Sequence, residues 1–332
     1  MDLSIFEGSK ILVTGASGLI GQALVKKLIL HKGKKPVEVY ALVRNEEKAR
    51  AVFSKLPQEH LHYTVCDACG LKPENLGINY IVHGASKTAS KDFVSEPVEV
   101  ILNSVDGTKS LLEFARANPV KGFVYLSTME VYGAPSTDEK IFEDHASTVD
   151  TMSVRSSYPE SKRLCESLCS AYAAEYGVPA KVVRLTQTFG EGVDYNDGRV
   201  FAEFARCAIE GKDIVLKTKG ETKRNYIDVQ DTADAILTVL VKGVAGEAYN
   251  AANEETYCSI LEMANLVAKE FGCGKIKVRI EEGDVAKLGY APTLKMNLST
   301  AKLQGLGWSA SVNLKQSFER MIDYMKNKWQ KK

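Results

Sequence analysis

Tyr158 and Lys162 stand four residues apart in the stretch YPESK, and their types suggest proton transfer. On a helix, side chains at this spacing share one face. A lysine ammonium beside a phenol stabilises the phenolate and lowers its pKa. Such a phenol can exchange a proton with a substrate hydroxyl while a hydride moves to or from a nicotinamide. The pair therefore predicts a proton-transfer role for Tyr158 with support from Lys162.

A hydroxyl, a thioether and a carboxylate follow one another at the end of an apolar run, in the stretch GFVYLSTMEVYG at 122–133. We expect Thr128, with Ser127 beside it, to orient the reacting oxygen through a hydrogen bond. Met129 can neither give nor take a proton. Glu130 has three open roles: a base at a carbon next to a ketone, a partner of a substrate hydroxyl, or a structural acid that caps local backbone amides.

A glycine-rich turn directly follows the first apolar run, in the stretch KILVTGASGLIGQAL that begins at Lys10. It follows a strand pattern and opens a helical pattern, so its backbone amides can approach a pyrophosphate at the helix N-terminus. The turn therefore predicts a dinucleotide site. The residues expected to contact the cofactor there are Gly15, Ser17, Gly18, Leu19, Ile20 and Gly21.

The end of the second apolar run indicates which dinucleotide binds. An NAD site usually has a carboxylate here for the ribose 2′-hydroxyl. This run ends in Arg44 instead, with Lys48 and Arg50 nearby. A cation suits a 2′-phosphate because charge-assisted hydrogen bonds to phosphate are strong. The sequence therefore favours NADP over NAD, and the alternative is a solvated arginine at a strand end.

Short apolar runs alternate with helical periodicity through the first half of the chain. This alternation predicts a parallel sheet covered by helices on both faces. The expected strands are Lys10–Val13, Glu38–Val43, His62–Val65, Tyr80–His83, Gly122–Leu126 and Lys181–Leu185. The expected helices between them include Leu19–Leu30, Val98–Ala117 and Tyr158–Tyr176.

The alternation loosens after about residue 186, where short apolar stretches, loops and helices mix. We therefore expect an α/β Rossmann fold, a doubly wound parallel sheet with a smaller C-terminal α/β lobe. Residues 1–186 would form the dinucleotide-binding domain, completed by strand and helix returns from later residues. Residues 187–332 would form the substrate-binding lobe.

The composition limits the classes of partner and compartment. The 332 residues carry a formal net charge of +1, which gives no electrostatic case for nucleic acid or an acidic membrane. Neither a membrane-spanning apolar run nor the layout of a signal peptide is present, so we expect a cytoplasmic protein. Seven scattered cysteines argue for reduced thiols. Cys66 and Cys69 form a CxxC motif without a second pair at zinc-finger spacing, so no metal site is expected.

Three motifs in order, TGASGLIG, STMEVYG and YPESK, resemble those of the extended short-chain dehydrogenase/reductases, and among these the nucleotide-sugar epimerase/dehydratase family. The resemblance covers nearly the whole chain. It implies a seven-stranded Rossmann domain that binds NAD or NADP, and a lobe that binds a nucleoside diphosphate sugar. It also implies a homodimer in which two long helices of each chain, here Val98–Ala117 and Tyr158–Tyr176, form a four-helix interface.

The resemblance also assigns roles to single residues. It implies that Thr128, Tyr158 and Lys162 form the catalytic set, next to Glu130 with its open role. Gln187 stands where the family often has an Asn that contacts the substrate. The residues placed along the cofactor are Asp67, near the adenine, and Ala85, Ser86 and Lys87 in the cleft. Those placed on the substrate are Lys87, Thr128, Gln187, Arg199 and Arg224, with the two arginines on the diphosphate, whose oxygens suit a guanidinium fork.

The chain departs from the patterns of several family branches at Met129. The 4,6-dehydratases normally have an Asp there that acts as an acid, so ordinary dehydration is disfavoured. The UDP-glucuronate decarboxylases usually have Ser there and tend to carry an Arg before the terminal Gly-Trp, where this chain has Thr293–Ser299 without an arginine, so decarboxylation is disfavoured too. The 4-epimerases usually have a small inert residue, and Met129 is likewise inert.

Three functions from different classes follow. The first is a nucleotide-sugar epimerase that oxidises its substrate transiently to a keto sugar and recycles the bound cofactor. The second is an NADPH-dependent reductase of a keto sugar or other carbonyl, which Arg44 favours; dehydration and decarboxylation are further alternatives. The third is a non-catalytic NADP sensor or scaffold on this fold, against which the set of Thr128, Tyr158 and Lys162 argues.

Overall fold

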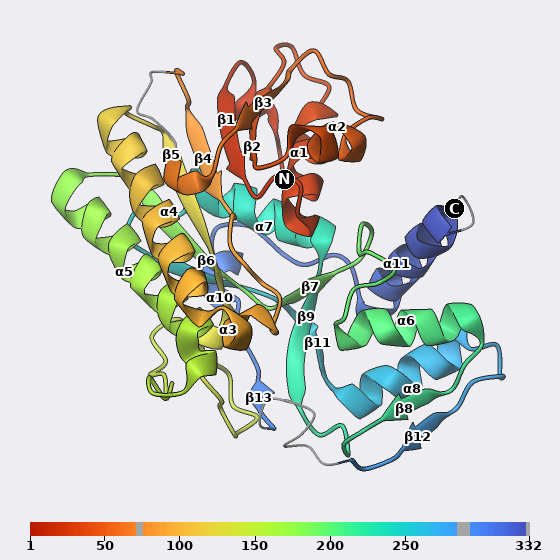
Figure 1. Cartoon of the computed structure of the whole chain (residues 1–332). Helices are drawn as coiled ribbons and strands as arrows, with labels where there is room; N and C mark the ends of the chain where they lie inside the picture. Colours follow the sequence, from red (N-terminus) through yellow and green to blue (C-terminus); the bar gives the residue numbers. More distant parts are fainter. Residues whose placement is uncertain (71–75, 284–292, 330–332) are drawn as a thin grey trace.

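The computed structural model describes residues 1–70, 76–283 and 293–329 of the chain. Its main feature is a seven-stranded sheet with the strand order β10-β6-β5-β4-β1-β2-β3 (Figure 1). Every neighbouring pair in this sheet runs parallel. The structure therefore confirms the predicted Rossmann-type α/β fold. The strands are β1 (Lys10–Thr14), β2 (Glu38–Val43), β3 (Leu61–Val65), β4 (Tyr80–His83), β5 (Gly122–Thr128), β6 (Ala180–Leu185) and β10 (Ala248–Ala251).

The strands of this sheet read as continuous apolar runs because helices bury both of its faces. All seven residues of β5 are buried, which is why the run was visible in the sequence. β2 and β4 have the predicted bounds, whereas β5 continues past Leu126. Ser127 and Thr128 remain in the strand since they pair in register with Arg184 and Leu185 of β6.

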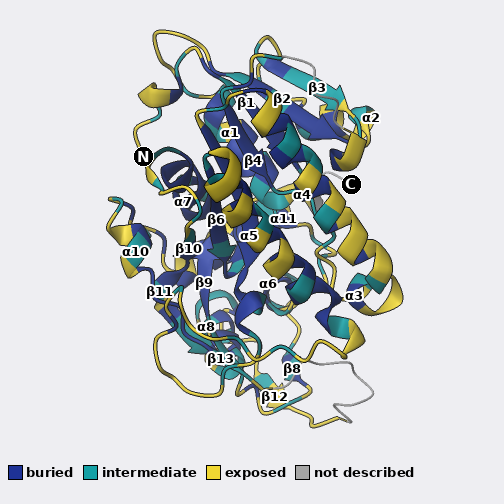
Figure 2. Cartoon of the chain, turned by 90° about the vertical axis from the view of Figure 1, so that its left-hand side faces the viewer, coloured by how far each residue is buried: buried dark blue, intermediate teal, exposed yellow. Residues whose placement is uncertain are grey.

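Two pairs of helices cover the sheet. α1 (Leu19–Ile29) and α7 (Val229–Lys242) pack into the hydrophobic core of one face. α4 (Pro97–Ala117) and α5 (Ser157–Tyr176) lie side by side on the other face (Figure 1). Figure 2 shows that the outer sides of α4 and α5 are exposed while the strands behind them are buried. The shorter elements of this part are η1 (Ser4–Phe6), α2 (Glu46–Val52), η2 (Ala68–Gly70), α3 (Asp92–Ser95), η3 (Met129–Tyr132) and η4 (Val154–Ser156).

The later part of the chain builds two small sheets and their helices, next to the carboxyl ends of the main strands. β9 pairs with β7, β11 and β13, and β8 pairs with β12. The elements are β7 (Gln187–Phe189), α6 (Val200–Glu210), β8 (Ile214–Leu216), β9 (Lys223–Asp228), β11 (Asn253–Ser259), α8 (Ile260–Phe271), β12 (Val278–Ile280), β13 (Lys295–Met296), α10 (Ala301–Gln304) and α11 (Leu314–Trp329). β10 lies beyond residue 186 and is a strand of the main sheet. α7 also lies beyond residue 186 and packs on that sheet. The division of the chain at that residue stays a prediction.

The smaller lobe has a hydrophobic core of its own. Phe189 of β7 stacks on Phe201 of α6 with ring centres 4.7 Å apart, and Phe318 of α11 lies 4.9 Å from Phe189. Burial of aromatic rings drives this packing, so the lobe holds its shape against the sheet. No helix in the described ranges combines the length and apolar character needed to cross a bilayer.

Candidate active site

The glycine-rich turn between β1 and α1 has no room for side chains. Gly15 adopts a φ of +67°, and a Cβ on it would lie 2.8 Å from the carbonyl oxygen of Gly84. A Cβ on Gly21 would lie 2.3 Å from the carbonyl oxygen of Gly15. Gly18 is the N-cap of α1. The turn therefore has the close-packed backbone at a helix N-terminus that a pyrophosphate requires. The other predicted contacts in the turn, Ser17, Leu19 and Ile20, are partly exposed.

A buried hydrogen-bond network fixes the segment after β4 against this turn. The Thr14 hydroxyl accepts hydrogen bonds from the backbone N–H groups of Gly84 and Ala85, at 3.1 and 3.0 Å. His83 Nδ1 lies 2.8 Å from the same hydroxyl, and burial lowers the pKa of His83 to about 3. The imidazole is thus neutral and structural. The network holds Ala85 and Ser86 at the predicted cofactor cleft, and sequence reasoning did not find it.

Arg44 and Asp67 mark the carboxyl ends of β2 and β3, and both are exposed. The Asp67 carboxylate accepts a hydrogen bond from the backbone N–H of Cys69 at 3.2 Å, so it shapes the turn that follows β3. Burial raises the pKa of the Cys69 thiol to about 11 and also raises that of Cys66, which keeps both thiols protonated at neutral pH. The CxxC motif is therefore a pair of free, unreactive cysteines.

Thr128 and Tyr158 meet where β5 ends and α5 begins. Tyr158 lies in the first turn of α5, and its side chain is 7% exposed. Thr128 lies near its hydroxyl and lowers its pKa. The Thr128 hydroxyl accepts a hydrogen bond from the backbone N–H of Glu130 at 3.2 Å. This bond fixes the threonine near the tyrosine oxygen.

The electrostatics of Tyr158 differ from the expectation. Burial, followed by the negative charge of Glu130, raises the pKa of Tyr158, while Thr128 and the charge of Arg155 lower it less strongly. Lys162 is not among these influences. Its Nζ lies 5.8 Å from the centre of the Tyr158 ring and donates a hydrogen bond to the carbonyl oxygen of Leu126 at 2.8 Å. That Lys162 supports the proton transfer of Tyr158 stays a prediction.

Burial makes the charged form of Lys162 unfavourable. Its side chain is fully enclosed, and burial lowers its pKa to about 8. The ammonium lies 4.8 Å from the centre of the Tyr125 ring, where the π face gives it partial compensation. The lysine therefore carries a readily lost charge directly behind the tyrosine.

Glu130 forms an ion pair that the sequence did not predict. Arg155 Nη1 donates to Glu130 Oε2 at 2.8 Å. Arg155 belongs to the short turn η4, which ends immediately before α5. The sequence signal for Arg155 is its position three residues before Tyr158. The spacing of Tyr158 and Lys162, which predicts the site, does not include it.

Phe93 of α3 covers one face of the Tyr158 ring. The rings of Phe93 and Tyr158 stack in parallel, 4.2 Å apart and inclined by 6°. The Ser157 hydroxyl donates to the carbonyl oxygen of Phe93 at 2.9 Å and ties the two segments together. Val100 of α4 completes this small buried cluster. A substrate must therefore reach the tyrosine at its hydroxyl edge.

The two neighbours of Thr128 have partners of their own. Ser127 donates to Glu166 Oε1 of α5 at 2.5 Å. Its expected share in orienting the substrate oxygen stays a prediction. Met129 is 3% exposed, and its sulfur accepts a hydrogen bond from the Thr186 hydroxyl at 3.4 Å.

The predicted substrate residues lie in different environments. Gln187 begins β7 and is partly exposed, beside the end of β6. Arg224 of β9 has a buried Nε without a hydrogen-bond partner among the described residues. Arg199 pairs with Asp197, with Nη2 2.6 Å from the carboxylate. Lys87 pairs with Glu96 across the loop that leads to α3.

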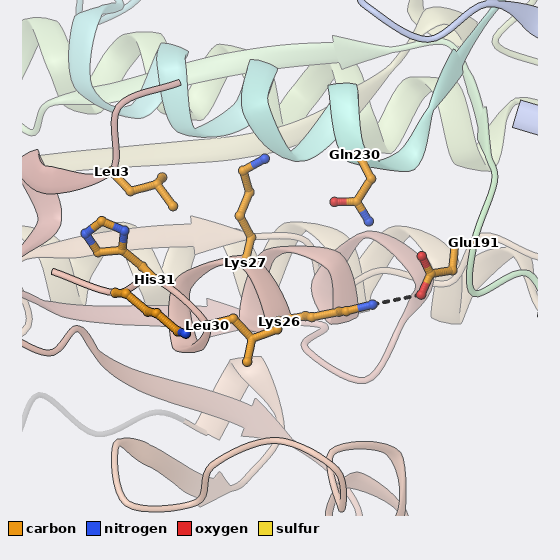
Figure 3. A pocket seen from close by; sticks show the side chains of 8 residues that line it. Leu3, Lys26, Lys27, Leu30, His31, Glu191 and Gln230 are labelled. Carbon is orange, nitrogen blue, oxygen red and sulfur yellow. Dashed lines mark hydrogen bonds and ion pairs between the residues drawn. The ribbon is translucent and has the colours of Figure 1, made fainter. Parts of the chain in front are cut away.

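A separate hollow of about 470 Å³ lies beside α1 and α7 and holds none of these residues (Figure 3). Lys26 reaches across it to Glu191 at 2.7 Å, as Figure 3 shows. Its lining residues are Leu3, Lys26, Lys27, Leu30, His31, Lys32, Glu191 and Gln230. Because it holds none of the predicted catalytic or cofactor residues, we assign it no role in the chemistry.

Residues 11–252 match the model of the NAD dependent epimerase/dehydratase family, which spans most of the chain. The chain belongs to this family. It is 26% identical to UDP-glucuronic acid decarboxylase 1 of Xenopus tropicalis over 98% of this chain and 74% of the relative. It is 27% identical to UDP-glucuronic acid decarboxylase 6 of Arabidopsis thaliana over 94% of this chain and 87% of the relative.

Solved structures of other family enzymes share the fold of this epimerase/dehydratase family member. The UDP-N-acetylglucosamine 4-epimerase of Methanobrevibacter ruminantium M1 aligns with a TM-score of 0.82 at 18% identity, over 97% of this chain and 99% of the other. The UDP-glucuronic acid 4-epimerase of Bacillus cereus, solved with UDP-glucuronic acid and NAD, aligns with a TM-score of 0.80 at 21% identity, over 96% and 99%. At these identities the likeness concerns the fold.

The nicotinamide dinucleotide that the family name implies fits the residues of this enzyme. The side-chain-free turn of Gly15 and Gly21 would hold the pyrophosphate. Asp67 stands on the adenine side of the sheet, after β3. Tyr158 and Lys162 stand at the other end, after β5. When bound, the nicotinamide supplies hydride transfer.

Proposed function

We propose that this enzyme is a nucleotide-sugar epimerase that works through transient oxidation at a sugar hydroxyl. The observation that carries the proposal is the placement of Thr128 near the buried Tyr158, next to a buried, inert Met129. This set can move a proton on and off one oxygen. It has no second acid at the position between Thr128 and Glu130 from which water would have to be expelled.

Each side chain has a defined task in this scheme. Thr128 orients the substrate oxygen and the tyrosine oxygen together. Tyr158 takes the hydroxyl proton as hydride leaves the same carbon, and returns it after the keto sugar has turned. Its raised pKa holds the neutral phenol at rest, so the enzyme needs positive charge nearby to form phenolate. Lys162, with its pKa of about 8, is the residue behind the ring that can respond to such changes.

Decarboxylation is the second candidate, because the curated relatives described above are UDP-glucuronic acid decarboxylases. It begins with the same oxidation, which turns a hexuronate into a β-keto acid that can lose CO₂. An inert Met129 is compatible with this route as well. The two reactions differ in whether the carboxylate survives, so one substrate can separate them.

The groups for the rest of the substrate and for the cofactor form a further part of the proposal. Arg224, with its unpartnered Nε, and Arg199 would bind the diphosphate, and Gln187 would contact the sugar. We favour NADP because exposed Arg44 offers a cation at the end of β2. An epimerase of this kind keeps its cofactor through purification, whereas a reductase consumes added NADPH.

We further propose a homodimer formed by α4 and α5. Val98, Ile101 and Leu102 on α4 and Leu164 on α5 are large apolar side chains that remain 38–62% exposed in the single chain. Exposed apolar side chains on two neighbouring helices, here called the apolar strip, are typical of a subunit interface. The seven free cysteines support a reducing, cytoplasmic location.

The test is incubation of the purified enzyme with UDP-glucuronate, followed by NMR and mass spectrometry of the product. A product of unchanged mass with inverted configuration supports epimerisation. Loss of the mass of CO₂ supports decarboxylation instead. Tyr158→Phe is expected to lower kcat by about 10²-fold or more, the usual contribution of a positioned general base. Tyr324→Phe on α11 is the matched control, and equal activity of both variants would contradict the scheme.

A further inference from the structure

The ion pair of Glu130 and Arg155 is placed where the charge of a substrate would matter. Both charges influence the ionisation of Tyr158, Glu130 upward and Arg155 downward. Both side chains are only partly exposed, at 25% and 36%. A surface ion pair of long side chains contributes little to stability. This pair instead lies beside the reacting hydroxyl, so its effect on bound molecules is larger than its effect on folding.

Arg155 has donors to spare. An arginine carries five N–H donors, and within the described part of the chain this one makes a single hydrogen bond, from Nη1 to Glu130. Its remaining N–H groups can donate hydrogen bonds to a second carboxylate, since the guanidinium fork suits bidentate binding. Glu130 alone would repel such an anion. The arginine converts an acidic site into one that tolerates and binds a negative charge.

The covering of Tyr158 directs the sugar towards this arginine. Phe93 stacks on one face of the ring and closes it to a sugar. The guanidinium carbon of Arg155 lies 5.7 Å from the centre of that same Phe93 ring, at the rim of the cover. A sugar whose C4 hydroxyl reaches Tyr158 therefore presents its neighbouring carbons to the rim. In a hexuronate the carboxylate is attached to C5, the ring atom next to the reacting C4.

We propose that Arg155 binds the carboxylate of a nucleoside diphosphate hexuronate and thereby selects an anionic sugar over a neutral one. This inference rests on the proposed function, because it assumes that the C4 hydroxyl meets Tyr158. It assigns to η4 a task in specificity that is separate from the proton transfer of α5. The carboxylate bridges between the free side of the guanidinium and the Tyr158 edge, while Glu130 keeps the other side of the arginine in place.

The experiment compares UDP-glucuronate with UDP-glucose on the complete enzyme. Arg155→Leu is expected to lower kcat/KM for UDP-glucuronate by about tenfold or more, as the loss of a charged hydrogen bond does. The value for UDP-glucose should fall by a smaller factor, because that sugar loses only the positive charge that Arg155 supplies beside Tyr158. Arg155→Lys should restore part of the preference, because it keeps the charge without the fork. Arg163→Leu, on the exposed side of α5, is the matched control.

A double variant separates contact from charge balance. If Arg155 only neutralises Glu130, then Arg155→Leu combined with Glu130→Gln should regain the affinity for UDP-glucuronate in calorimetry. If Arg155 contacts the carboxylate, the preference stays lost in the double variant. Equal losses on both sugars, or recovery in the double variant, overturn the inference. Calorimetric preference for UDP-glucuronate that depends on Arg155, without turnover of any sugar, would sustain the inference and overturn the proposed function.

Discussion

At the scale of a single residue, three neighbouring influences act on the orientation and the ionisation of Tyr158, and their effects on its pKa differ in sign. Phe93 and the body of the protein bury its ring, which favours the neutral phenol. Thr128 lies near its hydroxyl, which favours one orientation. Arg155 supplies the positive charge that partly offsets Glu130. The tyrosine is therefore rigidly placed and hard to ionise at rest. Its phenol proton leaves only when the charge around the ring changes.

The buried charge of Lys162 lowers the stability of the folded protein. Burial lowers its pKa from the usual 10.5 to about 8, so the folded state is penalised by the lysine charge wherever that charge is present. Below pH 8 the penalty is complete. Between about pH 8 and 10.5 the unfolded chain binds the proton that the folded chain has lost, so stability rises with pH there.

We therefore expect Lys162→Met to melt at a higher temperature than the unmodified enzyme at pH 7, although its activity is lost. The difference should shrink as the pH rises from 8 towards 10, because the buried lysine is then neutral. Thermal melts of both proteins at several pH values check this. Lys181→Met should show the same trend, because burial lowers the pKa of Lys181 as well, and a gap for Lys162→Met that widens with pH would contradict the linkage.

At the scale of elements, the turns between strands and helices carry the chemistry. Gly15 and Gly21 let α1 approach β1 closely enough for a pyrophosphate. We expect Gly21→Ala to abolish retention of the nicotinamide cofactor, since its Cβ would lie 2.3 Å from the carbonyl oxygen of Gly15. The ultraviolet spectrum of denatured extracts measures the bound cofactor. Gly198→Ala, whose Cβ would meet nothing within 4 Å, should retain it. Comparable retention by both variants would place the dinucleotide elsewhere.

The elements themselves were largely readable from the sequence. β4 is buried along its whole length and β2 at most of its positions, so the apolar runs marked the bounds of both strands correctly. β10 was not bounded, because its residues Ala248–Ala251 include Asn250, which is buried and accepts a hydrogen bond from Tyr132. A polar residue satisfied by a distant partner breaks the apolar pattern that sequence reasoning uses.

The contacts between elements were not readable, for a related reason. Thr128 and Tyr158 were named from motifs, but Phe93 and Arg155 reach the same place from α3 and η4, which carry no motif. The sequence likewise did not predict that Lys162 donates a hydrogen bond to the carbonyl oxygen of Leu126. Spacing along a helix predicts which side chains share a face, but not which neighbouring strand supplies their partners.

At the scale of the whole molecule, the predicted site residues come from both the main sheet and the smaller lobe, which has a separate core. Thr128 and Tyr158 belong to the sheet layers, and Gln187 and Arg224 to the small sheets of the lobe. The helices that carry the catalytic tyrosine also present the exposed apolar strip. Val100 of α4 packs on Phe93 and Tyr158, so packing against α4 and the order of the catalytic ring are linked.

The proposed homodimer gives the strip a test. We expect the unmodified enzyme to have the mass of two chains in light scattering, and Leu102→Asp to have the mass of one. Leu102 is 49% exposed at the centre of the strip, and a buried, unpaired carboxylate there would be unfavourable in both copies. Val244→Asp, at a 61% exposed valine after α7, should leave the mass unchanged. A single-chain mass for the unmodified enzyme, or a dimer that tolerates Leu102→Asp, would show that α4 and α5 do not form the interface.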